Sequence, residues 1–77
     1  MAGDSSSSFP FGLDRAQFTS AVNKLPEAEK LVMTLSYYEG LNDVDIAAAL
    51  QENERRIAEI RESALQRVAG DLGIPPA

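Results

Sequence analysis

The sequence predicts an all-α protein, a small four-helix domain in which the last two helices form a helix-turn-helix. Apolar residues recur three and four positions apart along most of the chain, and no stretch alternates with the two-residue period of a strand. Capping residues precede most of the predicted helices and glycines follow two of them. With 77 residues, the chain has room for one domain with a modest core.

Residues 1–12 are predicted to be a flexible tail or linker, and residues 13–77 to form the domain. The first segment contains four consecutive serines, two glycines and a proline. Such a composition buries too little apolar surface to offset the entropy of ordering the backbone. Phe9 and Phe11 are exceptions that can dock on the domain.

The first helix is predicted to run from Asp14, as its N-cap, to about Lys24, with Phe18 and Val22 as its apolar stripe.

The second helix is predicted to begin at Pro26, because proline fits the first turn of a helix. Glu27 and Glu29 place negative charge at its positive end. Gly40 is expected to end the helix in the left-handed conformation. The predicted buried face consists of Ala28, Leu31, Val32, Leu35 and Tyr38.

The third helix is predicted from Asn42, as N-cap, to Leu50, and the fourth from Asn53, as N-cap, to about Ala69, with Gly70 ending it. The inward-facing residues of the third helix are expected to be Val44, Ile46, Ala47 and Leu50. Those of the fourth are expected to be Ile57, Ile60, Ala64, Leu65 and Val68. The Gln51-Glu52-Asn53 turn between them completes the spacing that a helix-turn-helix requires.

Residues 14 to 68 resemble region 4 of bacterial sigma factors of the sigma-70 family, most closely the flagellar and sporulation type. The resemblance depends on the order of several motifs rather than on any one of them. These are Leu25-Pro26-Glu27, Leu31-Val32 with Leu35, Tyr37-Tyr38-Glu39-Gly40-Leu41, Ile46-Ala47-Ala48-Ala49-Leu50, Arg56-Ile57-Ala58-Glu59-Ile60-Arg61 and Ala64-Leu65.

The resemblance implies a domain for transcription initiation whose last helix binds the −35 promoter element and whose other face docks on the beta flap of the RNA polymerase core. By position, the groove-facing residues are Glu54, Arg55, Ala58 and Glu59, and the residues near phosphates are Arg56, Arg61 and Arg67. Arg55 suits a bidentate contact to guanine, and a carboxylate such as Glu54 or Glu59 can accept from cytosine N4.

The turn departs from the family pattern, which is commonly glycine, an apolar residue, then serine or threonine. If Gln51 adopts a positive φ, the cost relative to glycine is on the order of 1 kcal/mol. Glu52 stands where the family has an apolar residue, so it must turn outward or find a cation. Arg56, four residues later, is placed to pair with it.

The charge pattern leaves two explanations open. The net charge is −5, Arg55 and Glu59 are spaced to pair with each other, and Asp43 and Asp45 lie on the helix that should cross the DNA backbone. Either the domain binds DNA weakly and depends on the rest of the factor and the polymerase, or it has become a protein-interaction module that engages the polymerase beta flap, an anti-sigma protein or a second copy of itself. A third alternative is an unrelated helical adaptor with coincidental spacing.

An enzyme is not expected. The chain has no histidine and no cysteine, so the common imidazole bases, thiol nucleophiles and zinc ligands are missing, and neither a cofactor nor a metal is predicted. No apolar run approaches the roughly 20 residues that span a bilayer, and no secretion signal is expected, because residues 1–12 contain no cationic segment followed by an apolar one. A cytoplasmic location without membrane contact is therefore predicted.

Overall fold

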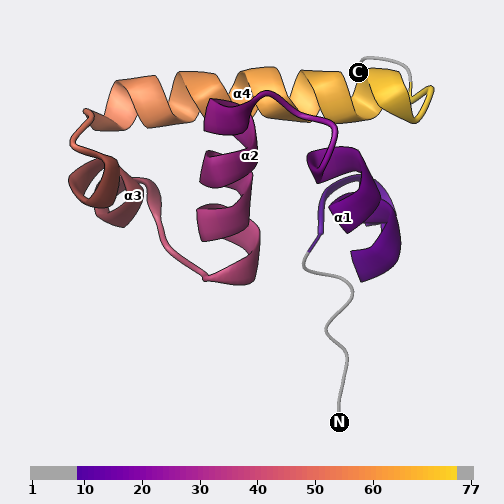
Figure 1. The fold of residues 1–77 in the computed structure, drawn as a ribbon, viewed down its shortest axis with the longest axis horizontal. Coiled ribbons are helices and arrows are strands. Elements are labelled where there is room, and N and C mark those ends of the chain that lie inside the picture. The colour runs from indigo at the N-terminus through magenta and orange to yellow at the C-terminus, as the bar shows by residue number, and fades with distance from the viewer. Residues whose placement is uncertain (1–8, 75–77) are drawn as a thin grey trace, which may run out of the picture.

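The structure, a computed structural model, describes residues 9–74 and contains four α-helices in this part of the chain. They are α1 (Arg15–Val22), α2 (Glu27–Met33), α3 (Asp43–Leu50) and α4 (Glu54–Asp71), with a 3₁₀ turn η2 (Pro10–Gly12) and a π-helix η3 (Thr34–Tyr38). No strand lies within residues 9–74. The long α4 runs along one side of the domain, and α1, α2 and α3 lie against it with α2 in the middle (Figure 1). The predicted all-α, four-helix fold is confirmed.

Side-chain caps fix where three of the helices begin, as the sequence predicts. Asp14 caps α1 by accepting a hydrogen bond from a backbone N–H in its first turn. Asn42 Oδ1 accepts from the N–H of Asp45 at 2.9 Å, and Asn53 Oδ1 accepts from the N–H of Arg56 at 2.8 Å. Each cap satisfies a donor that the helix itself leaves unpaired.

The second helix differs from its prediction in the face that it buries. Val32 and Met33 are fully buried, whereas Ala28 is exposed and Leu31 is 40% exposed, so the prediction for the last two is wrong. Helix α2 lies between α1 and α3, and Met33 packs with residues of α1 while Val32 packs with residues of α3 (Figure 1). Its buried stripe is therefore centred on the adjacent residues 32 and 33 rather than on residues 28 and 31.

The π-helix η3 continues α2 with a wider turn. The N–H of Glu39 donates to the carbonyl of Thr34 at 3.2 Å, five residues earlier. A π turn changes the phase of the residues that follow it, which a period of 3.6 does not anticipate. Gly40 then adopts a φ of +75° and ends the segment in the left-handed conformation, as predicted.

Two further predictions are corrected at the ends of α3 and α4. Val44 was expected to face inward, but it lies in the first turn of α3 and is 54% exposed. Gly70 does not end the last helix, which continues to Asp71. Gly73, with a φ of +73°, takes that role, and the N–H of Ile74 donates to the carbonyl of Ala69 at 2.8 Å.

The core consists of two clusters that share α2 and α4. We call the first the aromatic cluster; it contains Phe9, Leu13, Phe18, Ala21, Val22, Leu25, Met33, Ala64 and Val68, with Tyr37, Tyr38 and Leu65 packed against it. We call the second the helix-turn-helix cluster; it contains Val32, Ile46, Ala47 and Ile57, with Leu35, Leu41, Leu50 and Ile60 packed against it.

The segment before α1 contributes to the aromatic cluster. Phe9 is buried, and its ring centroid lies 5.0 Å from that of Phe18 and 5.7 Å from that of Tyr38. Phe11 instead is 46% exposed. Of the predicted tail or linker at residues 1–12, residues 1–8 lie outside the described residues, and residues 9–12 lie against the domain through Phe9.

Candidate nucleic-acid interface

The turn between α3 and α4 contains a left-handed residue that is not glycine. Gln51 adopts φ 59° and ψ 45°, in the left-handed region. The N–H of Glu52 donates to the carbonyl of Ala47 at 2.8 Å, which closes the end of α3. The side chain of Glu52 is exposed and has no ion pair with Arg56 among residues 9–74, so that predicted pair is wrong.

The first two turns of α4 present one face to solvent. Ile57 is fully buried in the helix-turn-helix cluster and fixes the rotation of the helix about its axis. As a result, all four residues predicted to face the groove are exposed: Glu54, Arg55, Ala58 and Glu59. A shallow open hollow follows this face and is lined by Arg55, Ala58, Glu59, Glu62, Ser63 and Gln66.

Arg56 and Arg55 differ in their partners. Arg56 Nη1 lies 3.6 Å from Glu59 Oε1, and both side chains are 58% exposed, so this pair contributes little to stability. The expected pairing of Arg55 with Glu59 is therefore wrong. Arg55 has no ion pair within residues 9–74, which leaves its guanidinium available on the outer face of α4.

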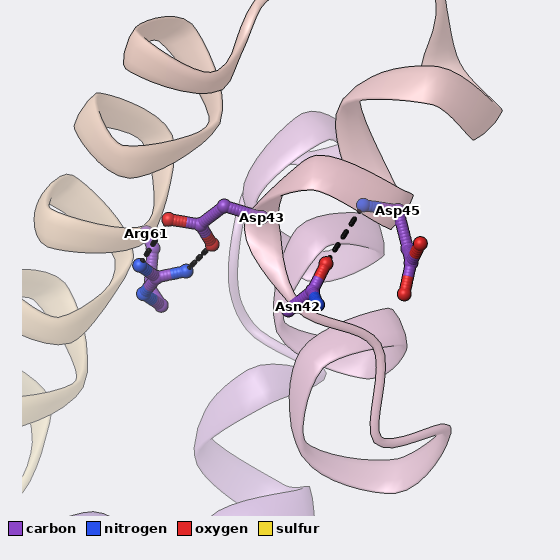
Figure 2. Close-up of polar contacts among 4 residues, drawn as sticks. All are labelled: Asn42, Asp43, Asp45 and Arg61. Atoms are coloured by element: carbon purple, nitrogen blue, oxygen red, sulfur yellow. Dashed lines mark hydrogen bonds and ion pairs between the residues drawn. The ribbon is translucent and has the colours of Figure 1, made fainter.

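Arg61 makes a bidentate ion pair with Asp43 in the first turn of α3 (Figure 2). Nη2 donates to Oδ2 at 2.7 Å, and Nη1 donates to Oδ1. The hydrogen bonds from Arg61 hold the pKa of Asp43 below its ordinary value, and the same bonds raise the pKa of Arg61. Asp45, two residues later, lies on the opposite side of this turn from Arg61 (Figure 2).

Arg67 is held by a buried carboxylate of α2. Its Nε lies 3.0 Å from Oε1 of Glu29, whose side chain is only 11% exposed. Ser63 Oγ donates to Oε2 of the same carboxylate at 2.8 Å. This network joins α2 to the second half of α4, where the sequence prediction placed Arg67 near phosphates.

Comparison with known proteins identifies the family. Residues 21–69 match the family described as Sigma-70, region 4. The chain belongs to the sigma-70 region 4 family. It is 41% identical over 59 residues to RNA polymerase sigma factor FliA of Escherichia coli (strain K12), and 39% identical over 59 residues to that of Salmonella typhimurium (strain LT2). The FliA of Yersinia enterocolitica is 38% identical over 58 residues.

These matches cover 75–77% of this chain but 25% of each relative, so the chain spans about a quarter of their length. No solved structure matches the chain significantly. The predicted resemblance to region 4 of the flagellar type is confirmed.

In this region 4 domain, three of the four arginines of α4 are paired with carboxylates from three different elements. Arg56 pairs within α4, Arg61 with α3 and Arg67 with α2. Sequence reasoning missed the last two pairs because their partners lie 18 and 38 residues away. Only a short-range i, i+3 or i, i+4 spacing is visible in a sequence.

Within residues 9–74, no group of three or more acidic, histidine or cysteine side chains is arranged to hold a metal ion. The helices of this same part of the chain are also too short or too polar to cross a membrane.

Proposed function

We propose that this chain is the promoter-recognition domain of a bacterial alternative sigma factor and that it binds the −35 element through the outer face of α4. The observation that carries the proposal is the exposed face of the first two turns of α4. That face is held out from the core by Ile57 and presents Arg55 without a carboxylate partner among the described residues. A helix-turn-helix places this part of its second helix against base edges in the major groove.

The chemistry of that face suggests how sequence is read. The guanidinium of Arg55 matches the O6 and N7 acceptors of guanine, Ala58 suits contact with a thymine methyl, and Glu59 can accept a hydrogen bond from cytosine N4. Few cations on this face are free to contact phosphates, so binding by the chain alone is expected to be weak and sensitive to salt. In this proposal the domain acts in transcription initiation together with the polymerase core. It is located in the cytoplasm and has no enzymatic activity.

A titration of fluorescently labelled duplexes at low salt tests the proposal. The chain is expected to prefer a −35-type duplex over a scrambled one, and Arg55→Ala is expected to reduce that preference about tenfold, because one bidentate base contact is lost. Arg56→Ala is the matched control: it removes the same charge one position away and should weaken both duplexes alike. A folded chain without affinity for either duplex at low salt would refute the proposal.

A protein-interaction module is the second candidate, and one observation favours it. Leu31 on α2 is 40% exposed, whereas the adjacent Val32 and Met33 are fully buried. The net charge of −5 disfavours binding to a polyanion, so this exposed leucine suits a protein partner such as the beta flap of the polymerase or an anti-sigma protein. Loss of beta-flap binding in Leu31→Ser, with DNA binding unchanged, would assign the two activities to different faces. If the wild-type chain binds the flap but no duplex, this second candidate replaces the first.

A further inference from the structure

Asp43 lies where a helix-turn-helix domain approaches the DNA backbone. The first helix of the motif crosses the backbone, and Asp43 is in the first turn of that helix, α3. A free carboxylate there would repel phosphate. Instead, both of its oxygens accept hydrogen bonds from Arg61 (Figure 2). The guanidinium fork that binds a carboxylate in this way can also bind a phosphate in a bidentate manner.

Arg61 remains near the surface despite this pair. Its side chain is 26% exposed, and the side chain of Asp43 is 28% exposed. Both line a shallow hollow open to solvent, together with Ser36, Leu41, Asn42 and Val44. Asp43 is the only partner of Arg61 in an ion pair among residues 9–74. A guanidinium released from Asp43 therefore has a short path to solvent, or to a phosphate beside the first turn of α3.

We infer that Asp43 competes with DNA phosphate for Arg61 and thereby lowers the affinity of the domain for DNA of any sequence. The inference rests on the proposed function, because it concerns the same DNA-binding surface. Arg61, which the family resemblance places near phosphates, makes no phosphate contact while the pair is intact. Asp43 thus acts as an internal competitor for Arg61 and lowers the affinity for all DNA sequences alike. Discrimination between DNA sequences depends on the residues on the outer face of α4.

Asp45 provides a matched comparison within the same turn. It carries the same charge, is exposed, and has no arginine partner among the described residues; it lies on the other side of the turn (Figure 2). Replacing either aspartate with asparagine removes one negative charge from α3. Only Asp43→Asn also breaks a bidentate ion pair, which loosens the hold on the guanidinium of Arg61 by removing its charged partner and one of its two acceptors. The difference between the two variants therefore isolates the release of Arg61 from the general loss of negative charge.

The experiment measures binding of the full 77-residue chain to a short duplex of scrambled sequence over a series of salt concentrations. Asp43→Asn is expected to bind several-fold more tightly than Asp45→Asn at low salt. The slope of log affinity against log salt should steepen by about 0.9, which corresponds to one additional phosphate contact. In an Arg61→Ala background the difference between the two aspartate variants should disappear, whereas Arg61→Ala alone should change affinity little.

Circular dichroism at the temperature of the titration verifies that each variant is folded, and Asp43→Ser is a second variant in case Asp43→Asn is not. Equal affinities and slopes for the Asp43 and Asp45 variants would overturn the inference. A weaker complex with Asp43→Asn would also overturn it, since the pair would then hold the domain in its binding geometry rather than compete with DNA. A wild-type chain that binds no duplex at low salt would instead refute the proposed function, and the inference with it.

Discussion

The two ends of α4 are stabilised by different kinds of contact. At its C-terminal end, Ala64 and Val68 pack into the aromatic cluster, where the rings of Phe9, Phe18 and the two adjacent tyrosines meet. At its N-terminal end, Ile57 packs into the smaller helix-turn-helix cluster, whose members are aliphatic. Aromatic rings bury the largest apolar areas, so most of the stability is expected at the aromatic end.

The helix-turn-helix end, with its smaller apolar cluster, is also held by directional polar contacts. Asn53 caps α4, Asn42 caps α3, and the Asp43–Arg61 pair joins the two helices. Such contacts add modest stability but tolerate little change in angle or distance. The aromatic end is therefore expected to contribute more of the stability through apolar burial, while the contacts at the other end hold the recognition helix in a defined orientation.

The largest expected effect comes from truncating the centre of the aromatic cluster. Phe18 is fully buried and contacts three other rings. Phe18→Ala should lower the free energy of unfolding by about 3–5 kcal/mol, as measured by urea denaturation, because it leaves a large cavity. Ile57→Ala, the matched change in the other cluster, should cost less, about 2–3 kcal/mol. An equal or larger loss for Ile57→Ala would contradict the proposed division between the two ends.

A smaller, pH-dependent effect is expected at the helix-turn-helix end. The bonds from Arg61 lower the pKa of Asp43 in the folded state, so the pair stabilises the fold at pH values above the ordinary carboxyl pKa. That contribution is lost as the pH falls through the lowered pKa. Asp43→Asn should cost about 1 kcal/mol near neutral pH, and the difference from wild type should shrink in acid.

Thermal or urea unfolding at several pH values measures this difference, with Asp45→Asn as the control for loss of charge in the same turn. A difference between wild type and Asp43→Asn that stays constant from neutral to acidic pH would show that the pair is not its source.

The smallest expected effect concerns the turn. Gln51 has a positive φ, which costs a residue with a Cβ more than it costs glycine. Gln51→Gly should therefore raise the free energy of unfolding by about 0.5 kcal/mol, after the greater flexibility of glycine in the unfolded chain is deducted. A loss of stability in this variant would mean that the side chain of Gln51 makes a contact that offsets its backbone strain.

Features determined by neighbouring residues could be predicted from the sequence. Asp14, Asn42 and Asn53 cap their helices because the donor that each one satisfies lies within three residues. Gly40 ends its segment for a similarly local reason, since only a residue without a Cβ accepts its φ freely. The exposure of the first two turns of α4 also followed from the spacing of its apolar residues.

Features determined by distant residues could not be predicted in this way. The buried face of α2 depends on the packing of α1 and α3 on either side, which is why Leu31 is exposed although it fits a helical stripe. The pairing of Arg61 with Asp43 and of Arg67 with Glu29 depends on how α4 crosses α3 and α2. The sequence shows that these arginines exist, but their partners are determined by tertiary structure.

Both α2 and α4 supply residues to both clusters: Val32 and Met33 are neighbours in sequence, yet they belong to different clusters, as do Ile57 and Ala64. Neither cluster can therefore melt without removing one wall of the other. The domain should therefore unfold in a single cooperative transition. The slowest-exchanging amide hydrogens should lie in α2 and α4, in the parts of these helices that pack against either cluster. A chain this small thereby keeps its recognition surface intact for as long as any of its core survives.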